Sequence, residues 1–166
     1  MNNLYVHSFE TGLGNIHTAA TDKGLAIVSL PGKSRKAFEA RINRYFPGSR
    51  ILVGGPVNKQ AQEQITAYLE GKLKKFTLKL DVPGTPFQKK VLNQVSQIPY
   101  GKTATYGEIA VRVGHPGASR AVGNANARNC LPLVIPCHRV VAANSPGGYD
   151  GGLKMKLRLL KMEGSI

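Results

Sequence analysis

The segment with the most reactive residues is Pro-Cys-His-Arg at positions 136–139, which lies between two apolar runs. A free thiol with a pKa of ~8.5 is mostly protonated at neutral pH, so a nucleophilic cysteine needs a base such as histidine beside it. The apolar flanks predict a buried strand through residues 133–141, and neighbours on a strand point to opposite faces. Cys137 and His138 therefore need a turn or a bridging water to cooperate. A core cysteine without a catalytic role is the alternative.

Carboxylates are scarce in the second half of the chain, so each one needs a reason. Residues 85–166 hold 11 basic side chains but only Glu108, Asp150 and Glu163 as acids. A surface acid near the C-terminal end of a helix would oppose the helix dipole. This favours a dedicated role for Glu163 over a place on a solvated helix end.

The net charge of the chain indicates a polyanionic partner. The 23 Lys and Arg residues against 9 Asp and Glu give +14 at pH 7 and a pI near 10.1. Such a surface favours nucleic acid first and an acidic membrane second. A basic surface that serves solubility alone is the alternative.

Cysteine content and the lack of targeting segments predict a cytoplasmic protein. No run of about 18 apolar residues could span a bilayer, and the first residues lack the pattern of a secretory signal. Cys130 and Cys137 cannot form a disulfide framework, so both are expected to be reduced. No metal site is expected, because His7, His17 and His115 alone are not a credible ligand set.

The first half of the chain has the alternation of short strands. Strands are expected over 15–20 and 25–30, on either side of a hairpin turn at 21–24. Two further strands are expected at 51–53 and 76–80. Together they predict an antiparallel sheet.

Helices and a break complete this half. Apolar residues at helical spacing predict helices over 33–46 and 57–71. Proline and glycine at 82–86 interrupt the pattern. We therefore predict two domains, 1–84 and 85–166.

Helical spacing dominates after the break. Pro86 begins one helix, and Thr105 is the predicted N-cap of the next, with Glu108 at its third position. A turn at 115–117 leads to another helix over 118–127, which makes a helix-turn-helix candidate. A hairpin-rich first half and a helical second half predict an α+β fold.

From about Pro86 to Gly164 the sequence resembles the O6-alkylguanine-DNA alkyltransferases, the methylated-DNA–protein-cysteine methyltransferases. Several separate motifs in the family's order carry the resemblance, whereas the first 80 residues match in pattern only. The most specific motif is Pro-Cys-His-Arg-Val at 136–140. The others are Ile-Pro-Tyr-Gly-Lys at 98–102 with Thr105 and Tyr106, Arg-Ala-Val-Gly at 120–123, Gly148 with Tyr149, and the closing Leu159, Leu160, Glu163 and Gly164.

The resemblance implies DNA repair by direct alkyl transfer. The family moves the alkyl group from O6 of guanine to its own cysteine, here Cys137, in a single irreversible turnover without metal or cofactor. It implies that His138, held by Glu163, activates the thiol through a water. Asn129 would position the active-site turn, and Tyr106 would hydrogen-bond the extruded base.

The resemblance also implies how DNA is bound. The second helix of the helix-turn-helix would enter the minor groove, with Arg120 filling the gap that the flipped nucleotide leaves. Arg128 would contact phosphate, or else would be a solvated cation at the helix end. Small residues would allow close approach, and a loop would close over the base. The small residues are Ser119, Ala121 and Gly123, and the pocket residues are Val140, Tyr149, Asp150 and Gly151.

Two positions depart from the family's pattern. Asp150 stands where serine is often found, and its carboxylate is unexpected near departing negative charge. Cys130 stands where proline is common, and we interpret it as structural because no histidine or acid is assigned to it.

The implied architecture is a ribonuclease-H-like N-terminal domain with an antiparallel sheet, followed by a winged-helix-like C-terminal domain. The implied partner is double-stranded DNA that contains O6-alkylguanine, and repair of O4-alkylthymine is left open. We expect no cofactor, no metal and no membrane partner. We also expect a monomer, for which cooperative binding along DNA is left open.

Three other functions compete with this hypothesis. A helix-turn-helix regulator leaves the Cys137 segment and Glu163 without a role, and a cysteine hydrolase leaves Arg120 unexplained. A non-catalytic damage sensor of the same family would lack the cysteine. The mass of the intact protein separates them, because only alkyl transfer adds an alkyl group to the chain.

Overall fold

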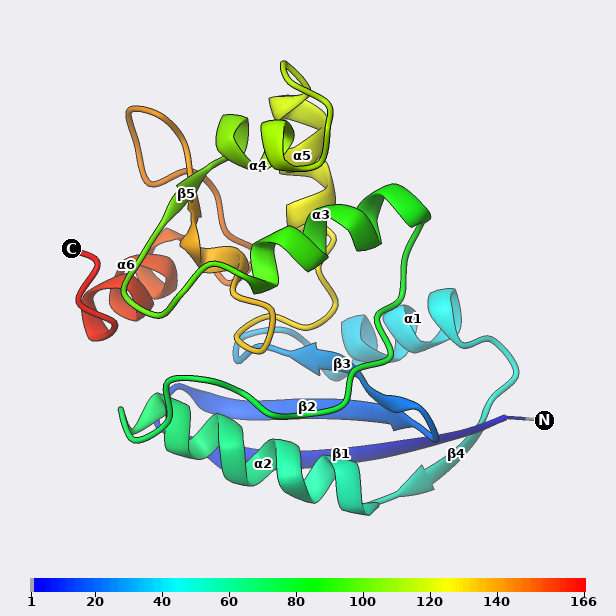
Figure 1. Cartoon of the computed structure of the whole chain (residues 1–166). Helices are drawn as coiled ribbons and strands as arrows, with labels where there is room; N and C mark the ends of the chain where they lie inside the picture. Colours follow the sequence, from blue (N-terminus) through cyan, green and yellow to red (C-terminus); the bar gives the residue numbers. More distant parts are fainter. Residues whose placement is uncertain (1) are drawn as a thin grey trace. The chain divides into compact units, whose positions relative to one another are not determined.

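The computed structural model describes residues 2–166 and divides into two compact units, Met1–Pro83 and Gly84–Ile166. Each unit is built from its own elements, shown in Figure 1 in colours that follow the sequence. Unit 1 holds a sheet and two helices, whereas unit 2 is mainly helical. The fold is α+β, as the sequence predicts.

The sheet of unit 1 has four strands in the order β3-β2-β1-β4. β2 pairs antiparallel with β3, as the hairpin turn at 21–24 predicts, and β1 also pairs antiparallel with β2, but β4 joins the edge parallel to β1. The strands are β1 (Asn3–Thr11), β2 (Gly14–Thr21), β3 (Gly24–Ser29) and β4 (Arg50–Val53).

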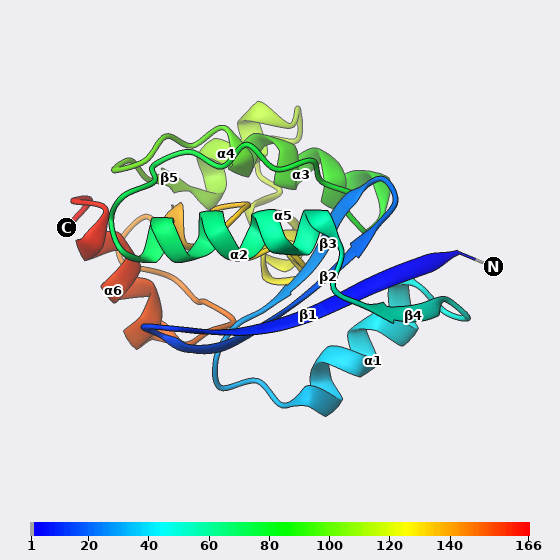
Figure 2. The same cartoon turned by 90° about the horizontal axis from the view of Figure 1, so that it is seen from below.

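Two helices cover opposite faces of this sheet. Helix α1 (Arg35–Tyr45) stacks Phe38 on His17 of β2, whereas Asn58 of α2 (Pro56–Leu69) accepts a hydrogen bond from Thr18 of the same strand. Because neighbouring residues on a strand point to opposite faces, α1 and α2 lie on the two sides of the sheet, as Figure 2 shows.

The expected strand at 76–80 is wrong, because only an isolated bridge between Leu25 and Leu80 forms there. Thr77 donates its backbone N–H to the Gln64 side chain and accepts a hydrogen bond from it through its hydroxyl. Phe76 packs on Tyr68 of α2. A helix side chain thus takes the place of a neighbouring strand.

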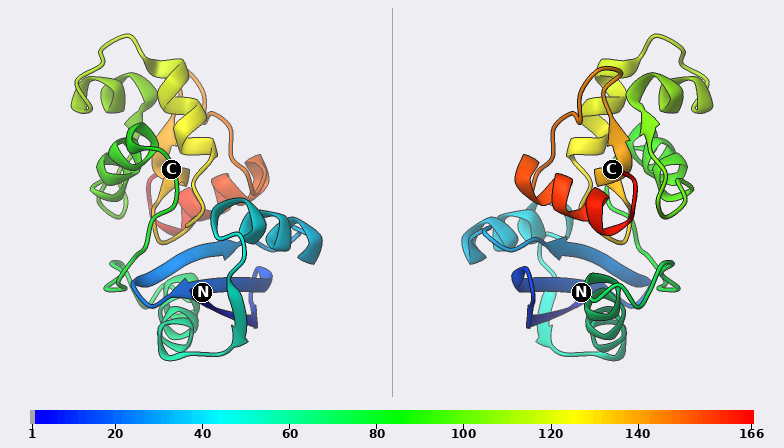
Figure 3. Two further views of the ribbon diagram at one scale, coloured as in Figure 1. Left: turned by 90° about the vertical axis from the view of Figure 1, so that its right-hand side faces the viewer. Right: turned by 90° about the vertical axis from the view of Figure 1, so that its left-hand side faces the viewer.

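Unit 2 has three helices in contact with one another, seen side by side in Figure 3. Thr85 caps α3 in a reciprocal capping box, and the Thr105 side chain accepts the Glu108 N–H at the start of α4, as predicted. A short parallel pair of strands and a last helix follow. The elements are α3 (Pro86–Ser96), β5 (Ala104–Thr105), α4 (Tyr106–Arg112), α5 (Ser119–Ala127), β6 (Val140–Val141) and α6 (Leu153–Met162).

Candidate active site

A turn, not a strand, presents Cys137. Leu133 adopts a positive φ of 74°, and Cys137–Arg139 forms one turn of 3-10 helix, so the extended segment expected at 133–141 is wrong except at β6. The cause lies in Asn129, whose side chain accepts the N–H of Leu131 at 2.9 Å and donates to the carbonyl of Ile135 at 3.0 Å. These bonds substitute for those of a strand partner.

Glu163 joins the two basic residues that follow the cysteine. The His138 Nε2 lies 2.9 Å from its Oε2, and neither side chain has any exposed surface. Arg139 donates Nε to Oε1 at 2.9 Å and Nη2 to Oε2 at 2.8 Å, while its Nη1 donates to the carbonyl of Ile98 at 2.7 Å. Arg139 belongs to the site but was not predicted from the sequence. The signal that could have identified it is its place directly after His138, in a half of the chain where Glu163 is one of only three acids.

Burial sets the protonation of the thiol and the imidazole. Burial raises the pKa of Cys137 to about 11, against the hydrogen bond from Asn129 and the positive charge of Lys156, while the Asp150 charge raises it further. Burial also lowers the pKa of His138, although Glu163 acts in the opposite direction. A neutral His138 that donates Nε2–H to Glu163 has Nδ1 as its basic nitrogen. The resting site therefore pairs a protonated thiol with a neutral base.

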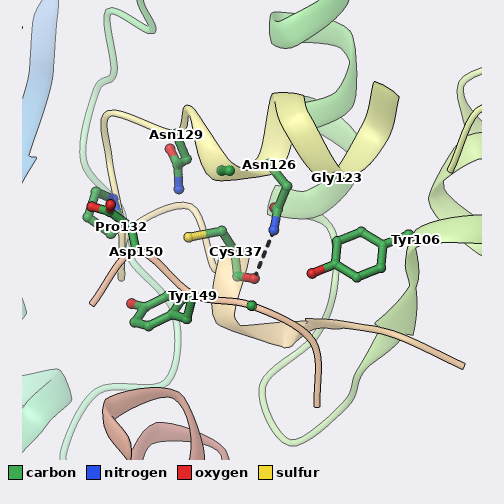
Figure 4. A pocket seen from close by; sticks show the side chains of 10 residues that line it. Tyr106, Gly123, Asn126, Asn129, Pro132, Cys137, Tyr149 and Asp150 are labelled. Atoms are coloured by element: carbon green, nitrogen blue, oxygen red, sulfur yellow. Dashed lines mark hydrogen bonds between the residues drawn. The ribbon is translucent and has the colours of Figure 1, made fainter. Parts of the chain in front are cut away.

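A cavity of about 310 Å³ lies against Cys137 (Figure 4). The Cys137 side chain lies between Tyr106 on one side and Asp150 with Pro132 on the other. The cavity is large enough for a single base. Its lining residues are Tyr106, Gly123, Asn126, Ala127, Asn129, Pro132, Cys137, Gly148, Tyr149 and Asp150.

Two of the predicted pocket residues lie outside the cavity lining. Val140 is buried in β6, and Gly151 follows Asp150, and neither of these described residues lines the cavity. Asn126 lines it without having been predicted, and its amide donates to the Cys137 carbonyl at 3.3 Å. Its position three residues after the predicted Gly123, on the same face of α5, is the signal that could have identified it.

Helix α5 has one face on the cavity and one on the surface. Gly123, which is half-buried, and Asn126 line the cavity. The other residues predicted to contact DNA are exposed. A single helix can therefore contact a partner outside and a base inside. The exposed positions are Ser119, Arg120, Ala121 and Arg128.

Among residues 2–166 no group of three His, Cys, Asp or Glu side chains could hold a metal ion. Over the same residues, none of the helices has the length and apolar character needed to cross a membrane.

Comparisons with known proteins cover nearly the whole chain. Residues 4–82 match the family model described as the ribonuclease-like domain of 6-O-methylguanine DNA methyltransferase, and residues 86–165 match its DNA binding domain. The chain is 44% identical over 163 residues to a methylated-DNA–protein-cysteine methyltransferase of Methanosarcina acetivorans, covering 98% of this chain and 99% of that one. It is 50% identical over 152 residues to the protein of the same name from Mycobacterium leprae, covering 89% and 92%.

Solved structures are similar over the same length. The chain matches Mycobacterium tuberculosis OGT in complex with DNA with a TM-score of 0.82 and 33% identity, covering 97% of this chain and 93% of that one. It matches the O6-methylguanine-DNA methyltransferase of Pyrococcus kodakaraensis with a TM-score of 0.65 and 29% identity, covering 97% and 99%.

Proposed function

The chain belongs to the family of 6-O-methylguanine DNA methyltransferases, and we propose from this that Cys137 is its alkyl acceptor. Members of the family repair DNA by transferring the alkyl group to a cysteine of their own. The observation that carries the assignment is that Cys137 lines the cavity beside the His138–Glu163 pair. Cys130 instead directs its Sγ toward the Arg128 carbonyl, at 3.7 Å.

The proposed reaction is an in-line displacement. The Cys137 Sγ forms a bond to the alkyl carbon while the bond from that carbon to O6 breaks, and its electron pair goes to the purine. The thiol proton passes to Nδ1 of His138 through a water, and the departing purine regains a proton with help from the Tyr106 hydroxyl. The thioether is stable, so each molecule reacts once.

Peptide mapping tests the assignment directly. After incubation with a duplex that contains O6-methylguanine, the intact protein should gain one methyl group, located on Cys137. A methyl group on Cys130 would contradict the assignment. An unchanged mass would favour a helix-turn-helix regulator instead.

The two units are proposed to divide the work. Unit 2 carries DNA binding and alkyl transfer, and unit 1 is a structural domain of the ribonuclease-like type, so the proposed domains are 1–84 and 85–166. The charge of +14 supplies phosphate contacts, which makes DNA binding sensitive to salt. We also propose a cytoplasmic location and a monomer. No cofactor is needed, since the alkyl acceptor is a side chain of the protein itself.

Arg120 is proposed to fill the stack after the nucleotide is flipped out. Arg120→Ala should slow repair of duplex DNA by roughly 10- to 100-fold, because extrusion costs a few kcal/mol that the arginine offsets. Reaction with free O6-benzylguanine should stay within about twofold, since a free base has no stack to leave. Rapid-quench rates on both substrates measure this.

Arg128→Ala is the matched control, because it removes one exposed cation from the end of the same helix. It should weaken DNA binding, but at saturating duplex it should leave the ratio of the two rates unchanged. Equal losses on duplex and free base for Arg120→Ala would remove the flipping role.

We expect the wild-type protein, which carries the Asp150 carboxylate, to transfer the alkyl group more slowly than a variant without this charge. The Asp150 charge raises the pKa of Cys137, so Asp150→Asn should lower that pKa and increase the thiolate fraction at neutral pH. Because the carboxylate is exposed, the gain should be modest, roughly two- to fivefold in transfer rate. Glu108→Gln changes the net charge equally at another exposed acid of unit 2 and should leave the rate unchanged. An equal gain in both variants would indicate a general charge effect on DNA binding.

A further inference from the structure

Lys156 occupies a position that is unfavourable for a cation. Its side chain has no exposed surface, and it lies in the second turn of α6, near the positive end of the helix dipole. Burying an ammonium group is costly unless nearby groups compensate. Lys156 lies on the buried face of α6 with Leu159, Leu160 and Glu163. Helical spacing predicts an apolar residue at such a position.

The compensating groups all belong to the active site. The Lys156 Nζ donates to the Val140 carbonyl at 2.6 Å and to the Gly148 carbonyl at 2.9 Å. Val140 directly follows the 3-10 turn that presents Cys137, and Gly148 lines the cavity in the loop that carries Tyr149. One ammonium group therefore joins the strand behind the nucleophile to the loop in front of it.

We propose that Lys156 is a positioning residue that acts as the counter-ion of the reacting Cys137 thiolate while tying the cavity loop to β6. The inference rests on the proposed role of Cys137. Lys156 would supply the positive charge that balances the thiolate, which the His138–Glu163 pair does not supply.

The charges around Lys156 agree with this role. Burial lowers the pKa of Lys156 to about 8, and the charge of Cys137 raises it. In return, the Lys156 charge lowers the pKa of Cys137, while Asp150 from the loop raises it. Lys156 also lowers the pKa of His138. The charge of Arg139 is already neutralised by Glu163, the carboxylate that also pairs with His138.

A coupled thiol and amine give a distinctive pH profile. In the proposed reaction the thiol proton passes to His138, so the reacting state, which is thiolate with imidazolium and ammonium, holds as many protons as the resting thiol, neutral imidazole and ammonium. With Lys156 charged, the transfer rate is therefore level with pH, and it falls as the pH rises through the pKa of Lys156, about 8, because the counter-ion is lost there. A thiol without this cation would react more slowly, at a rate that does not fall near pH 8.

The test compares Lys156→Gln with wild type in single-turnover methyl transfer from saturating duplex between pH 6 and 10. Glutamine retains N–H donors for the two carbonyls but has no charge. We expect a rate roughly 10- to 100-fold lower at pH 7.5, which does not fall above pH 8 where the wild-type rate falls. Lys156→Met, which lacks donors as well, should lose further rate on every substrate.

Lys154→Gln is the matched control, because it removes the same charge from an exposed position of the same helix. It should keep both the rate and the wild-type profile. A folded Lys156→Gln protein whose rate still falls above pH 8, as the wild-type rate does, would overturn the proposal.

The wild-type profile is itself a test if the variants fail to fold. A wild-type rate that does not fall as the pH rises from 8 to 10 would refute the counter-ion. Mapping the methyl group in the same samples separates the two hypotheses. Methyl absent from Cys137 refutes the proposed acceptor, whereas methyl on Cys137 with a rate that does not fall above pH 8 refutes only the role of Lys156.

Discussion

We expect Cys137→Ser to slow alkyl transfer by more than about 10³-fold and to leave the affinity for DNA within about twofold. A serine hydroxyl in the same buried position is a far weaker nucleophile than a thiol toward a saturated carbon. DNA affinity should persist because the exposed face of α5 and the net charge are unchanged. Single-turnover transfer and binding titrations on one duplex measure the two properties.

Cys130→Ser provides the matched comparison. Cys130 is also buried, at 2% exposure, but it does not line the cavity among the described residues. Its serine variant should retain transfer. If it lost transfer as completely as Cys137→Ser, the assignment of the acceptor would be wrong.

Glu163→Gln is expected to destabilise unit 2 by about 3–5 kcal/mol. The substitution keeps the shape of the side chain but leaves the buried Arg139 guanidinium, which has two hydrogen bonds to this carboxylate, without its counter-charge. His138 loses its orienting anion as well, so transfer should slow on duplex and free base alike. Urea unfolding monitored by circular dichroism gives the stability change.

The control for this prediction is Glu108→Gln, which removes an exposed acid from the first turn of α4. Only its interaction with the helix dipole is lost, so we expect less than about 1 kcal/mol. A similarly small change in Glu163→Gln would mean that water or another group compensates Arg139.

Local signals in the sequence were sufficient for most elements. The helix bounds followed from apolar spacing and from caps such as Thr105, whose side chain accepts the N–H that the sequence assigned to it. The hairpin of β2 and β3 followed from its turn residues. These features depend on contacts between residues close in the chain, which is why a pattern can predict them.

The parts that could not be predicted depend on distant partners. The strand at 76–80 failed because Gln64 bonds Thr77, and the segment before Cys137 turned because Asn129 bonds its backbone. Lys154 and Lys156 look alike in the sequence, and only the carbonyls of Val140 and Gly148 distinguish them. Family resemblance named Cys137, His138 and Glu163, but it did not reveal that Arg139 shares the same carboxylate.

The burial of Cys137 also determines how long an unused molecule stays competent. Peroxides and disulfides react with the thiolate, and a thiol with a pKa of about 11 is ionised on the order of one part in ten thousand at neutral pH. With 5% of its surface exposed, the sulfur is also shielded from such oxidants. A protein whose nucleophile reacts only once thereby keeps that thiol reduced until it meets a lesion. The small ionised fraction of the resting thiol protects it from oxidation.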